Sequence, residues 1–507
     1  MSPKRINLAI LLPFCLSGFL TSMDSVMVGT VLPTIVEALA LSSVQFSWVG
    51  TSYLIPSATL LPLWAQLSDI FGRKYIILLG YLLFIIGSLI CAISHSAAML
   101  IAGRALQGAG TGNIEVLINI RIADLFTLRD RGLYIGMYSA TSAAGVVLGP
   151  ILGGILAGST TCRWCFWINL PIGCISVLWL WKSLDLPNTG TSIWKGLRHV
   201  DWPGALSMTA GVVMLLLGVQ LGGTLYAWSS PAVLSLVLCG CAVLVLFLFL
   251  QQKISVRPII PLRLFGNISS SVALLICFCH GFSYITILYF LPVYFSVVLS
   301  ASLTTVRAYL SILTGPMVLS VAGAGVFVQR TGHYRITVWA GTFFLTLGFG
   351  LFIDLPPYLS WAPIVIYQLV IALGVGPLFQ MPLIVLHAWT ERKDLASANS
   401  LYSLTREMGS SIGIIVAQIL VQVRVKQNVA EALRSGLPRD HVSKISRDFT
   451  TLSKSLLSGM PDHQQHELKR ILTRSFGNVW MLETGISGVA LLSSCLIKYK
   501  ELSKEYT

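Results

Sequence analysis

Three isolated charged side chains in long apolar runs are the residues of this sequence best suited to chemistry. Asp24 is the only charge in the run GFLTSMDSVMVGT, residues 18–30. Arg104 and Glu115 share a later run, and their spacing places them within about 20° of one helix face. Because an unpartnered charge is costly in a bilayer, such residues mark paths for protons, ions or substrates. The pattern predicts proton binding and release, with Arg104 and Glu115 facing one aqueous cavity.

Each of these charges also has a structural interpretation. Asp24 and Arg104 could form a fixed ion pair that joins two helices, and Glu115 could link helices in the same way. The two interpretations of Asp24 differ in whether its carboxyl group titrates during a functional cycle.

Other polar residues in apolar runs are further candidates. Arg406, a second candidate for the cavity, is adjacent to Glu407, and the two are expected to point to different partners because neighbours lie about 100° apart on a helix. His280 and His387 could titrate near neutral pH, although a lone His is more often a packing residue. Glu483 lies near the outer end of the last run. Four aromatic residues could line an apolar cavity: Trp48, Tyr289, Tyr294 and Phe379.

The sequence lacks the motifs of common enzyme classes. It contains no GxxxxGK[ST] nucleotide loop, no HExxH zinc motif, no GxSxG nucleophile motif and no His/Cys metal cluster. We therefore expect neither an enzyme nor a metal site, and no cofactor beyond a proton as coupling ion.

The composition indicates an integral membrane protein. Of the 507 residues, 55% are hydrophobic and 11% are charged, whereas a soluble protein has about 25% charged residues. Gly and Pro within the apolar runs favour helices over barrel strands, so the expected fold class is all-α. Fourteen runs suit a membrane span of about 20 residues: 7–31, 47–67, 76–93, 97–119, 133–157, 165–182, 204–221, 231–250, 270–298, 306–328, 336–354, 361–386, 397–423 and 478–497.

The positions of Lys and Arg orient the chain and account for its net charge of +14. With a cytoplasmic N-terminus, nineteen of these cations fall in inner segments and one, Arg163, falls in the short outer loops. This asymmetry predicts that both termini are cytoplasmic. The basic balance therefore reflects topology, and we expect a lipid bilayer as partner and no nucleic acid. Cys162 and Cys165 lie in an outer loop where a disulfide is permitted, although unpaired cysteines are more common at this spacing.

The runs group as six, two and six. We expect an N-terminal six-helix half in 1–182, a linker with two extra membrane helices in 183–268, and a C-terminal half in 269–507. The outer connection 424–476 is polar with apolar residues at helical spacing. It is expected to form amphipathic helices, as a surface cap or as a gate for the substrate.

Two inner loops at matching positions of the halves resemble each other: SDIFGRKY at 68–75 and VQRTGHYR at 328–335. Such repeats are typical of transporters whose halves rock around a site at the membrane midplane. Gly72 supplies a tight turn, and Arg73 with Lys74 can simply fix topology. The presence of Asp69 in the same loop favours the interpretation that these cations belong to a charge network.

The run 133–157 carries a face of small residues with a proline at its centre. Small residues at four-residue spacing allow close helix contact, and proline favours a kink. The expected hinge consists of Gly145, Gly149, Pro150, Gly153 and Gly154.

Taken together, the motifs AQLSDIFGRKY, GRALQGAGTG, GVVLGPILGG and MDSVMVGTVLP resemble those of the major facilitator superfamily, specifically its fungal 14-span drug:proton antiporters. The resemblance implies a proton-coupling role for Arg104. It also implies that Asp69 and Arg73 close an inner gate with partners such as Asp124, Arg129 and Asp130. Ala65 stands where the family usually has Gly, and Glu115 is not expected from the family pattern.

The sequence therefore predicts a monomeric transporter that exports a small organic molecule in exchange for protons, in the plasma membrane. One alternative is a vacuolar carrier of basic amino acids, which the extra carboxylates Asp24 and Glu115 mildly favour. Another is a non-transporting nutrient sensor on the same fold, against which the short terminal tails argue.

Overall fold

The structure is a computed structural model and describes residues 3–39, 43–159, 163–183, 193–222, 226–253, 255, 258–427 and 461–502. Within these ranges the regular structure is helical, apart from one isolated bridge between Gly222 and Tyr226. The predicted all-α fold class is confirmed.

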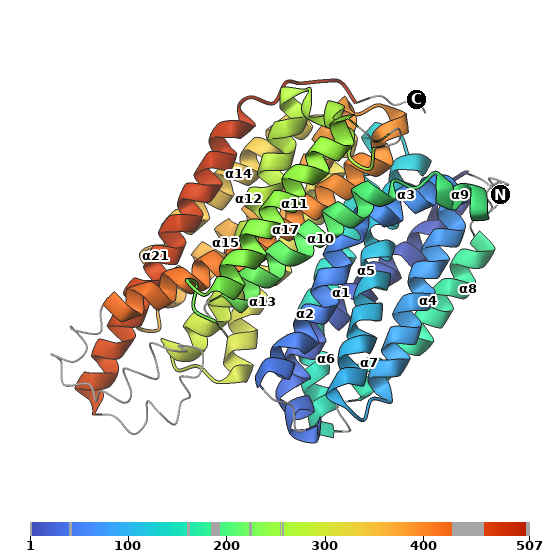
Figure 1. Cartoon of the computed structure of the whole chain (residues 1–507). Coiled ribbons are helices and arrows are strands. Elements are labelled where there is room, and N and C mark those ends of the chain that lie inside the picture. The colour runs from blue at the N-terminus through green and yellow to red at the C-terminus, as the bar shows by residue number, and fades with distance from the viewer. Residues whose placement is uncertain are drawn as a thin grey trace.

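The two halves of the chain form two groups of helices that lie side by side (Figure 1). The N-terminal group comprises α1 (Pro3–Leu39), α2 (Ser43–Thr59), α3 (Leu61–Phe71), α4 (Arg73–Ala92), α5 (Ala97–Leu125), α6 (Leu128–Ser159), α7 (Trp164–Trp167) and α8 (Asn169–Ser183). The C-terminal group comprises η1 (Leu262–Phe265), α12 (Ile268–Val297), α13 (Leu303–Thr331), α14 (Tyr334–Phe352), α15 (Trp361–Leu378), α16 (Met381–Trp389), η2 (Arg392–Asp394), α17 (Leu395–Gln427) and α21 (Asp462–Ser494).

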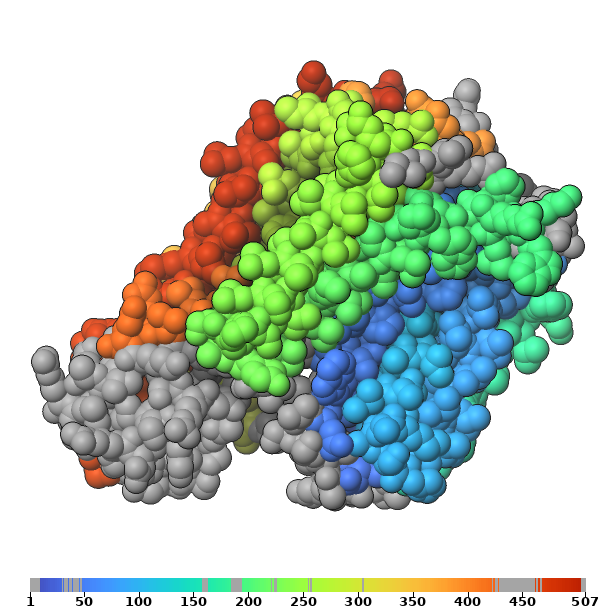
Figure 2. All heavy atoms as spheres, viewed as in Figure 1, coloured from blue at the N-terminus to red at the C-terminus, as the bar shows by residue number. Residues whose placement is uncertain are grey.

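Between the groups, the linker contributes α9 (Ile193–Arg198), α10 (Trp202–Leu221) and α11 (Pro231–Lys253). Helices α10 and α11 pack against each other, and α10 contacts α2 in one group and α17 in the other. Figure 2 shows this green pair lying across the front of both groups. Helix α10 therefore contacts both groups of helices.

Eleven helices in the described ranges are long and apolar enough to span a membrane. They correspond to eleven of the fourteen predicted runs, and the other three are the α2–α3 pair, α5 and α21. Helices α2 and α3 are separate segments on either side of Leu60, and four charged residues interrupt the apolar sequence of α5. Helix α5 packs along α4, and α21 packs along α14, so both lie beside helices that can span the membrane. The prediction of fourteen spans therefore remains open.

The helices extend into both ends of the predicted outer connection 424–476. Helix α17 continues to Gln427, and α21 begins at Asp462 rather than near residue 478. Helix α21 therefore begins before the predicted membrane run 478–497, because its first turns are polar and carry no hydropathy signal. Residues 428–460 lie outside the described part of the chain, as does Cys162, one of the two cysteines between which a disulfide is permitted.

The C-terminal segment returns to the face where two helices of its own half begin. The Lys498 amide donates to Ser269 Oγ over 3.0 Å, and the Lys500 amide donates to the Tyr334 hydroxyl over 2.8 Å. Ser269 and Tyr334 start α12 and α14. This face is the one that the cation count predicts to be cytoplasmic, and the orientation itself stays a prediction.

The two similar inner loops each turn on a glycine with positive φ. Gly72 has φ 94° between α3 and α4, and Gly332 has φ 79° at the end of α13. These are the positive-φ glycines of the described residues. Since side chains strain such backbone, the shared turn explains why both loops keep glycine.

Helix α6 packs closely on α1 through its small-residue face. A Cβ atom at Gly145 would lie 2.4 Å from the Phe19 carbonyl oxygen, and one at Gly149 would lie 2.9 Å from that of Met23. Pro150 lies inside α6, which continues through it to Ser159. The glycines therefore serve helix contact, and the hinge stays a prediction.

Candidate functional site

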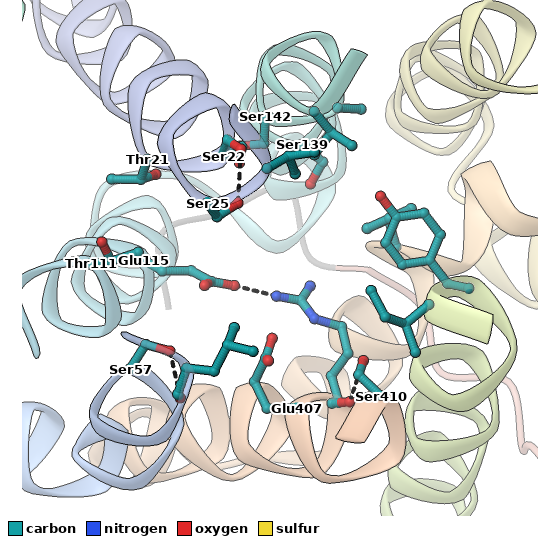
Figure 3. A pocket seen from close by; sticks show the side chains of 18 of the residues that line it. Thr21, Ser22, Ser25, Ser57, Thr111, Glu115, Ser139, Ser142, Glu407 and Ser410 are labelled. Atoms are coloured by element: carbon teal, nitrogen blue, oxygen red, sulfur yellow. Dashed lines mark hydrogen bonds and ion pairs between the residues drawn. The ribbon is translucent and has the colours of Figure 1, made fainter. Parts of the chain in front are cut away.

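A cavity of about 250 Å³ lies between the two groups of helices. On one side it is lined by residues of α1, α2, α5 and α6, and on the other by residues of α12 and α17 together with Phe379. Hydroxyl groups form much of the N-terminal wall, as Figure 3 shows for Ser22, Ser25, Ser139 and Ser142. We refer to this cavity as the central pocket.

An ion pair crosses the central pocket from one half to the other. Arg406 Nη2 of α17 bonds to Glu115 Oε1 of α5, and Glu407 projects beside them (Figure 3). The side chains of Arg406 and Glu115 are 17% and 27% exposed, so both remain in contact with the cavity. The pocket therefore holds two carboxylates and one guanidinium.

Arg406 and Glu407 line the same pocket although they are adjacent in α17, and Arg406 pairs with Glu115. That the two residues have different partners stays a prediction. One sequence prediction about these charges was wrong. Arg104 and Glu115 do not face one cavity, since Glu115 lines the pocket whereas Arg104 is 1% exposed and lies among other helices. Three helical turns of separation allow the two side chains different surroundings.

Asp24 and Arg104 form a buried ion pair beside the pocket. Arg104 Nη1 lies 2.8 Å from Asp24 Oδ2, and the Asp24 side chain is fully buried. Asn169 Nδ2 of α8 donates to Asp24 Oδ1 over 2.6 Å, and Gln107 Nε2 donates to the same oxygen over 3.4 Å. The carboxylate therefore has partners on two helices besides α1, as a buried charge requires.

The guanidinium of Arg104 is equally well surrounded. It donates to Gln107 Oε1 over 2.9 Å and to the Val49 carbonyl oxygen over 3.4 Å, and it lies 4.1 Å from the Tyr53 ring centroid. Asp24 and Arg104 therefore form an ion pair in this conformation, and whether Asp24 titrates during a functional cycle stays a prediction. Sequence reasoning missed Gln107 and Asn169, although Gln107 lies in the motif GRALQGAGTG.

The predicted charge network forms at the inner end of the N-terminal group. Arg73 Nη1 lies 2.6 Å from Asp69 Oδ1, and Arg73 Nε lies 3.2 Å from Asp124 Oδ2. Arg121, which the sequence analysis did not single out, lies 3.6 Å from the same Asp124 oxygen. The network joins α3, α4 and α5, and its role as a gate stays a prediction.

Arg129 and Asp130 bind the other half instead of Arg73. Arg129 donates to the carbonyl oxygens of Gln329 and Arg330 over 2.7 and 2.5 Å, and Gln329 Nε2 donates to Asp130 Oδ1 over 3.1 Å. Carbonyls in the last turn of a helix lack helical partners and attract cations. The start of α6 therefore caps the end of α13, and we call these contacts the inner clasp.

The remaining candidates are mostly packing residues. His280 Nε2 contacts the Val375 carbonyl oxygen over 3.1 Å, and both His280 and His387 are buried outside the pocket lining. Of the four aromatic candidates, Phe379 lines the pocket, whereas Tyr289 is exposed and Tyr294 is buried. No group of three or more potential metal ligands occurs in the described ranges.

Comparisons with known proteins identify the family of proteins to which this chain is similar. Residues 14–361 match the family model described as Major Facilitator Superfamily. The MFS-type transporter ppz2 of Metarhizium majus is 34% identical over 506 residues, covering 100% of this chain and 87% of that protein. The efflux pump dotC of Dothistroma septosporum is 34% identical over 501 residues, covering 99% and 86%.

Two solved structures share the fold at lower sequence identity. The human organic anion transporter MFSD10 has a TM-score of 0.59 at 14% identity, covering 96% of this chain and all of that chain. The proton:xylose symporter XylE has a TM-score of 0.55 at 14% identity, covering 96% and 95%. At this identity the two structures support the fold alone.

Proposed function

Because the chain belongs to the major facilitator superfamily and is a multi-pass membrane transporter rather than an enzyme, we propose that it exports a small organic molecule in exchange for protons. The observation that carries this proposal is the Glu115–Arg406 ion pair, which joins α5 and α17 across the central pocket. The similarity to a protein named an efflux pump supports the outward direction.

A proton and a substrate could both act on the Glu115–Arg406 ion pair. Protonation of Glu115 would remove one charge of the pair, and a bound substrate could replace either partner. Either event would weaken a link between the halves, since loss of one charge leaves the other without its partner. A ligand shifts the equilibrium between two conformations of the transporter only if it binds one of them more tightly. A ligand that contacts both α5 and α17 meets this condition, because movement of the halves changes the distance between these helices.

The halves proposed to move are 1–182 and 269–507, with the linker helices between them. In this conformation the inner clasp holds α6 to the end of α13, which favours a pocket closed toward the inner face. Opening inward would require Arg129 to release those carbonyl groups. The membrane potential contributes about 2.3 kcal/mol for each charge moved through 100 mV.

The buried Asp24–Arg104 pair is proposed as a second coupling element. Its charges are satisfied here, so its protonation requires a rearrangement that admits water to Asp24. Arg104 would then need another partner, and Gln107 already contacts it. We propose that Asp24 titrates in another step of the cycle.

The pocket chemistry favours a neutral or cationic substrate with hydroxyl or amine groups. Glu407 forms no ion pair within the described residues, so the pocket has one carboxylate more than it has guanidinium groups. This surplus is also the observation that favours the alternative of a vacuolar carrier for basic amino acids. We propose the plasma membrane as the primary location.

Transport by the purified protein tests the proposal. Proteoliposomes with an imposed pH gradient would be screened with a set of toxic organic compounds and with lysine, arginine and histidine. Export coupled to the gradient for an organic compound supports the proposal, and uptake of basic amino acids alone supports the vacuolar alternative. Binding without flux in any condition would indicate a sensor.

A further inference from the structure

Glu483 is a buried carboxyl group away from the central pocket. It lies in α21, which packs against α12, α14 and α17, and its side chain is 0% exposed. Neither carboxyl oxygen has a partner at full hydrogen-bond geometry among the described residues. The hydroxyl groups of Ser283 and Thr286 on α12 lie close enough to interact with the carboxyl group.

No cation faces this carboxyl group from the helices around it. Thr484, the residue after Glu483, lies near Gly350 of α14, and Thr286 lies near Gly413 of α17. These two contacts show which parts of α14 and α17 lie at the same height in the bundle as Glu483. The neighbouring stretches 339–352 of α14 and 408–421 of α17 contain no ionisable residue.

The other elements around the group also lack a countercharge. On α12 the ionisable neighbour is the buried thiol of Cys279. His280 of the same helix contacts the Val375 carbonyl oxygen instead, and Tyr284 lines the pocket. Within α21, no other ionisable residue lies between Arg474 and Ser494.

A carboxylate without a countercharge is far more costly to bury than a neutral carboxylic acid, even where neutral hydroxyl groups lie beside it. The neutral acid also carries an O–H donor, which the Ser283 hydroxyl oxygen can accept. We propose that Glu483 binds a proton in this conformation and forms a proton site separate from both the central pocket and Asp24.

Helix α12 connects this site to the pocket. Tyr284, Ile285 and Leu288 of α12 line the pocket, whereas Ser283 and Thr286 lie beside Glu483. A movement of α12 that reshapes the pocket therefore also changes the surroundings of Glu483. Water admitted there would favour the ionised form and release the proton. This link to the cycle rests on the proposed function, whereas the protonation itself does not.

Infrared difference spectroscopy of the purified full-length protein across a pH titration tests the protonation directly. A buried protonated carboxyl group gives a carbonyl band distinct from that of an ionised one. We expect this band in the wild-type protein near neutral pH, and its loss in Glu483→Gln. Glu391→Gln is the matched control, because the Glu391 side chain is 68% exposed, and it should keep the band.

Ser283→Ala provides a second variant that retains the carboxyl group. It should keep the band at a shifted frequency, since the O–H group loses its acceptor. A Glu483→Gln spectrum identical to the wild-type spectrum at every pH, or an unshifted band in Ser283→Ala, would overturn the proposal.

The transport consequence is measured separately. If Glu483 participates in the cycle, Glu483→Gln shifts the pH profile of export while Glu391→Gln does not. Loss of the infrared band in Glu483→Gln together with proton-independent transport by the wild type would contradict the proposed function and leave the proton site intact. An unchanged profile with loss of the band would overturn the link through α12.

Discussion

The Tyr53 ring lies against the buried Arg104 guanidinium, 4.1 Å from ring centroid to Cζ, while the Tyr53 hydroxyl donates to Thr111 Oγ1 over 3.0 Å. Tyr53 and Thr111 line the central pocket, and Arg104 does not. The Tyr53 side chain therefore lies between the pocket and Arg104. A proton moving between the pocket and Asp24 at this level would pass the Tyr53 ring.

Substitution of Tyr53 tests this separation. Tyr53→Phe keeps the ring over Arg104, a contact worth about 0.5–2 kcal/mol, and should retain proton-coupled export. Tyr53→Ala opens the buried pair to pocket water and should uncouple proton movement from substrate movement, so that the ratio of protons to substrate moved departs from that of the wild type. Proton and substrate fluxes would be measured together in proteoliposomes. Equal coupling in Tyr53→Ala and wild type would show that the ring is not a barrier.

The ion pair across the pocket predicts acid rescue for one substitution and none for another. Arg406→Gln leaves Glu115 and Glu407 in the pocket without their cation, so their repulsion should impair transport at neutral pH. Acidic pH neutralises these carboxylates and should restore part of the activity. Glu115→Gln leaves Arg406 beside Glu407 and should show no acid rescue. The measurement is export rate from pH 5 to 8, with Ser57→Ala as a pocket control. The same pH response in both variants would contradict the account.

The inner clasp predicts a shift in which side of the protein is open. Arg129→Gln removes the charge that caps the end of α13, a contact worth about 0.3–2 kcal/mol. The inward-open population should rise by about twofold or more, measured by alkylation of single cysteines near the clasp. Arg198→Gln, an exposed cation of α9 on the same predicted face, is the control and should leave accessibility unchanged. No change in Arg129→Gln would exclude the clasp as a determinant of conformation.

The contact of α6 with α1 predicts a difference between two glycine substitutions. Gly145→Ala places a methyl group 2.4 Å from the Phe19 carbonyl oxygen, whereas Gly29→Ala meets no atom within 4 Å. Overpacking of this kind typically costs about 1–3 kcal/mol. Thermal unfolding in detergent should therefore show a lower midpoint for Gly145→Ala and a midpoint near wild type for Gly29→Ala. Equal midpoints would mean that α6 and α1 separate without cost.

The sequence predicts local features of this transporter well and contacts between its halves poorly. Gly72 and Gly332 were recognisable because a tight turn has a short signature, and isolated charges drew attention to Asp24 and Arg104. The partner of Glu115 could not be deduced, because Arg406 lies 291 residues away on a helix of the other half. Arg129 was assigned the wrong partner for the same reason, since helix-end carbonyls leave no side-chain pattern in a sequence.

The buried neighbours of Asp24 show the same limit. Gln107 and Asn169 are unremarkable polar residues in apolar runs, and only the packing of α5 and α8 against α1 brings them to the carboxylate. In contrast, eleven of the predicted runs coincide with helices that are long and apolar enough to span a membrane. Such a run can be recognised from hydropathy alone, because it is one continuous apolar segment of the sequence.

Proton-coupled exchange is tested most directly by measuring proton and substrate movement together in proteoliposomes containing wild type or Asp24→Asn. The account predicts that a pH gradient drives substrate accumulation by the wild type, and that substrate efflux drives protons in the opposite direction. Asp24→Asn, reconstituted in equal amount, should lose the dependence on the gradient. Unchanged gradient-driven transport by Asp24→Asn would contradict the role of Asp24, and wild-type transport that ignores the gradient would contradict proton coupling altogether.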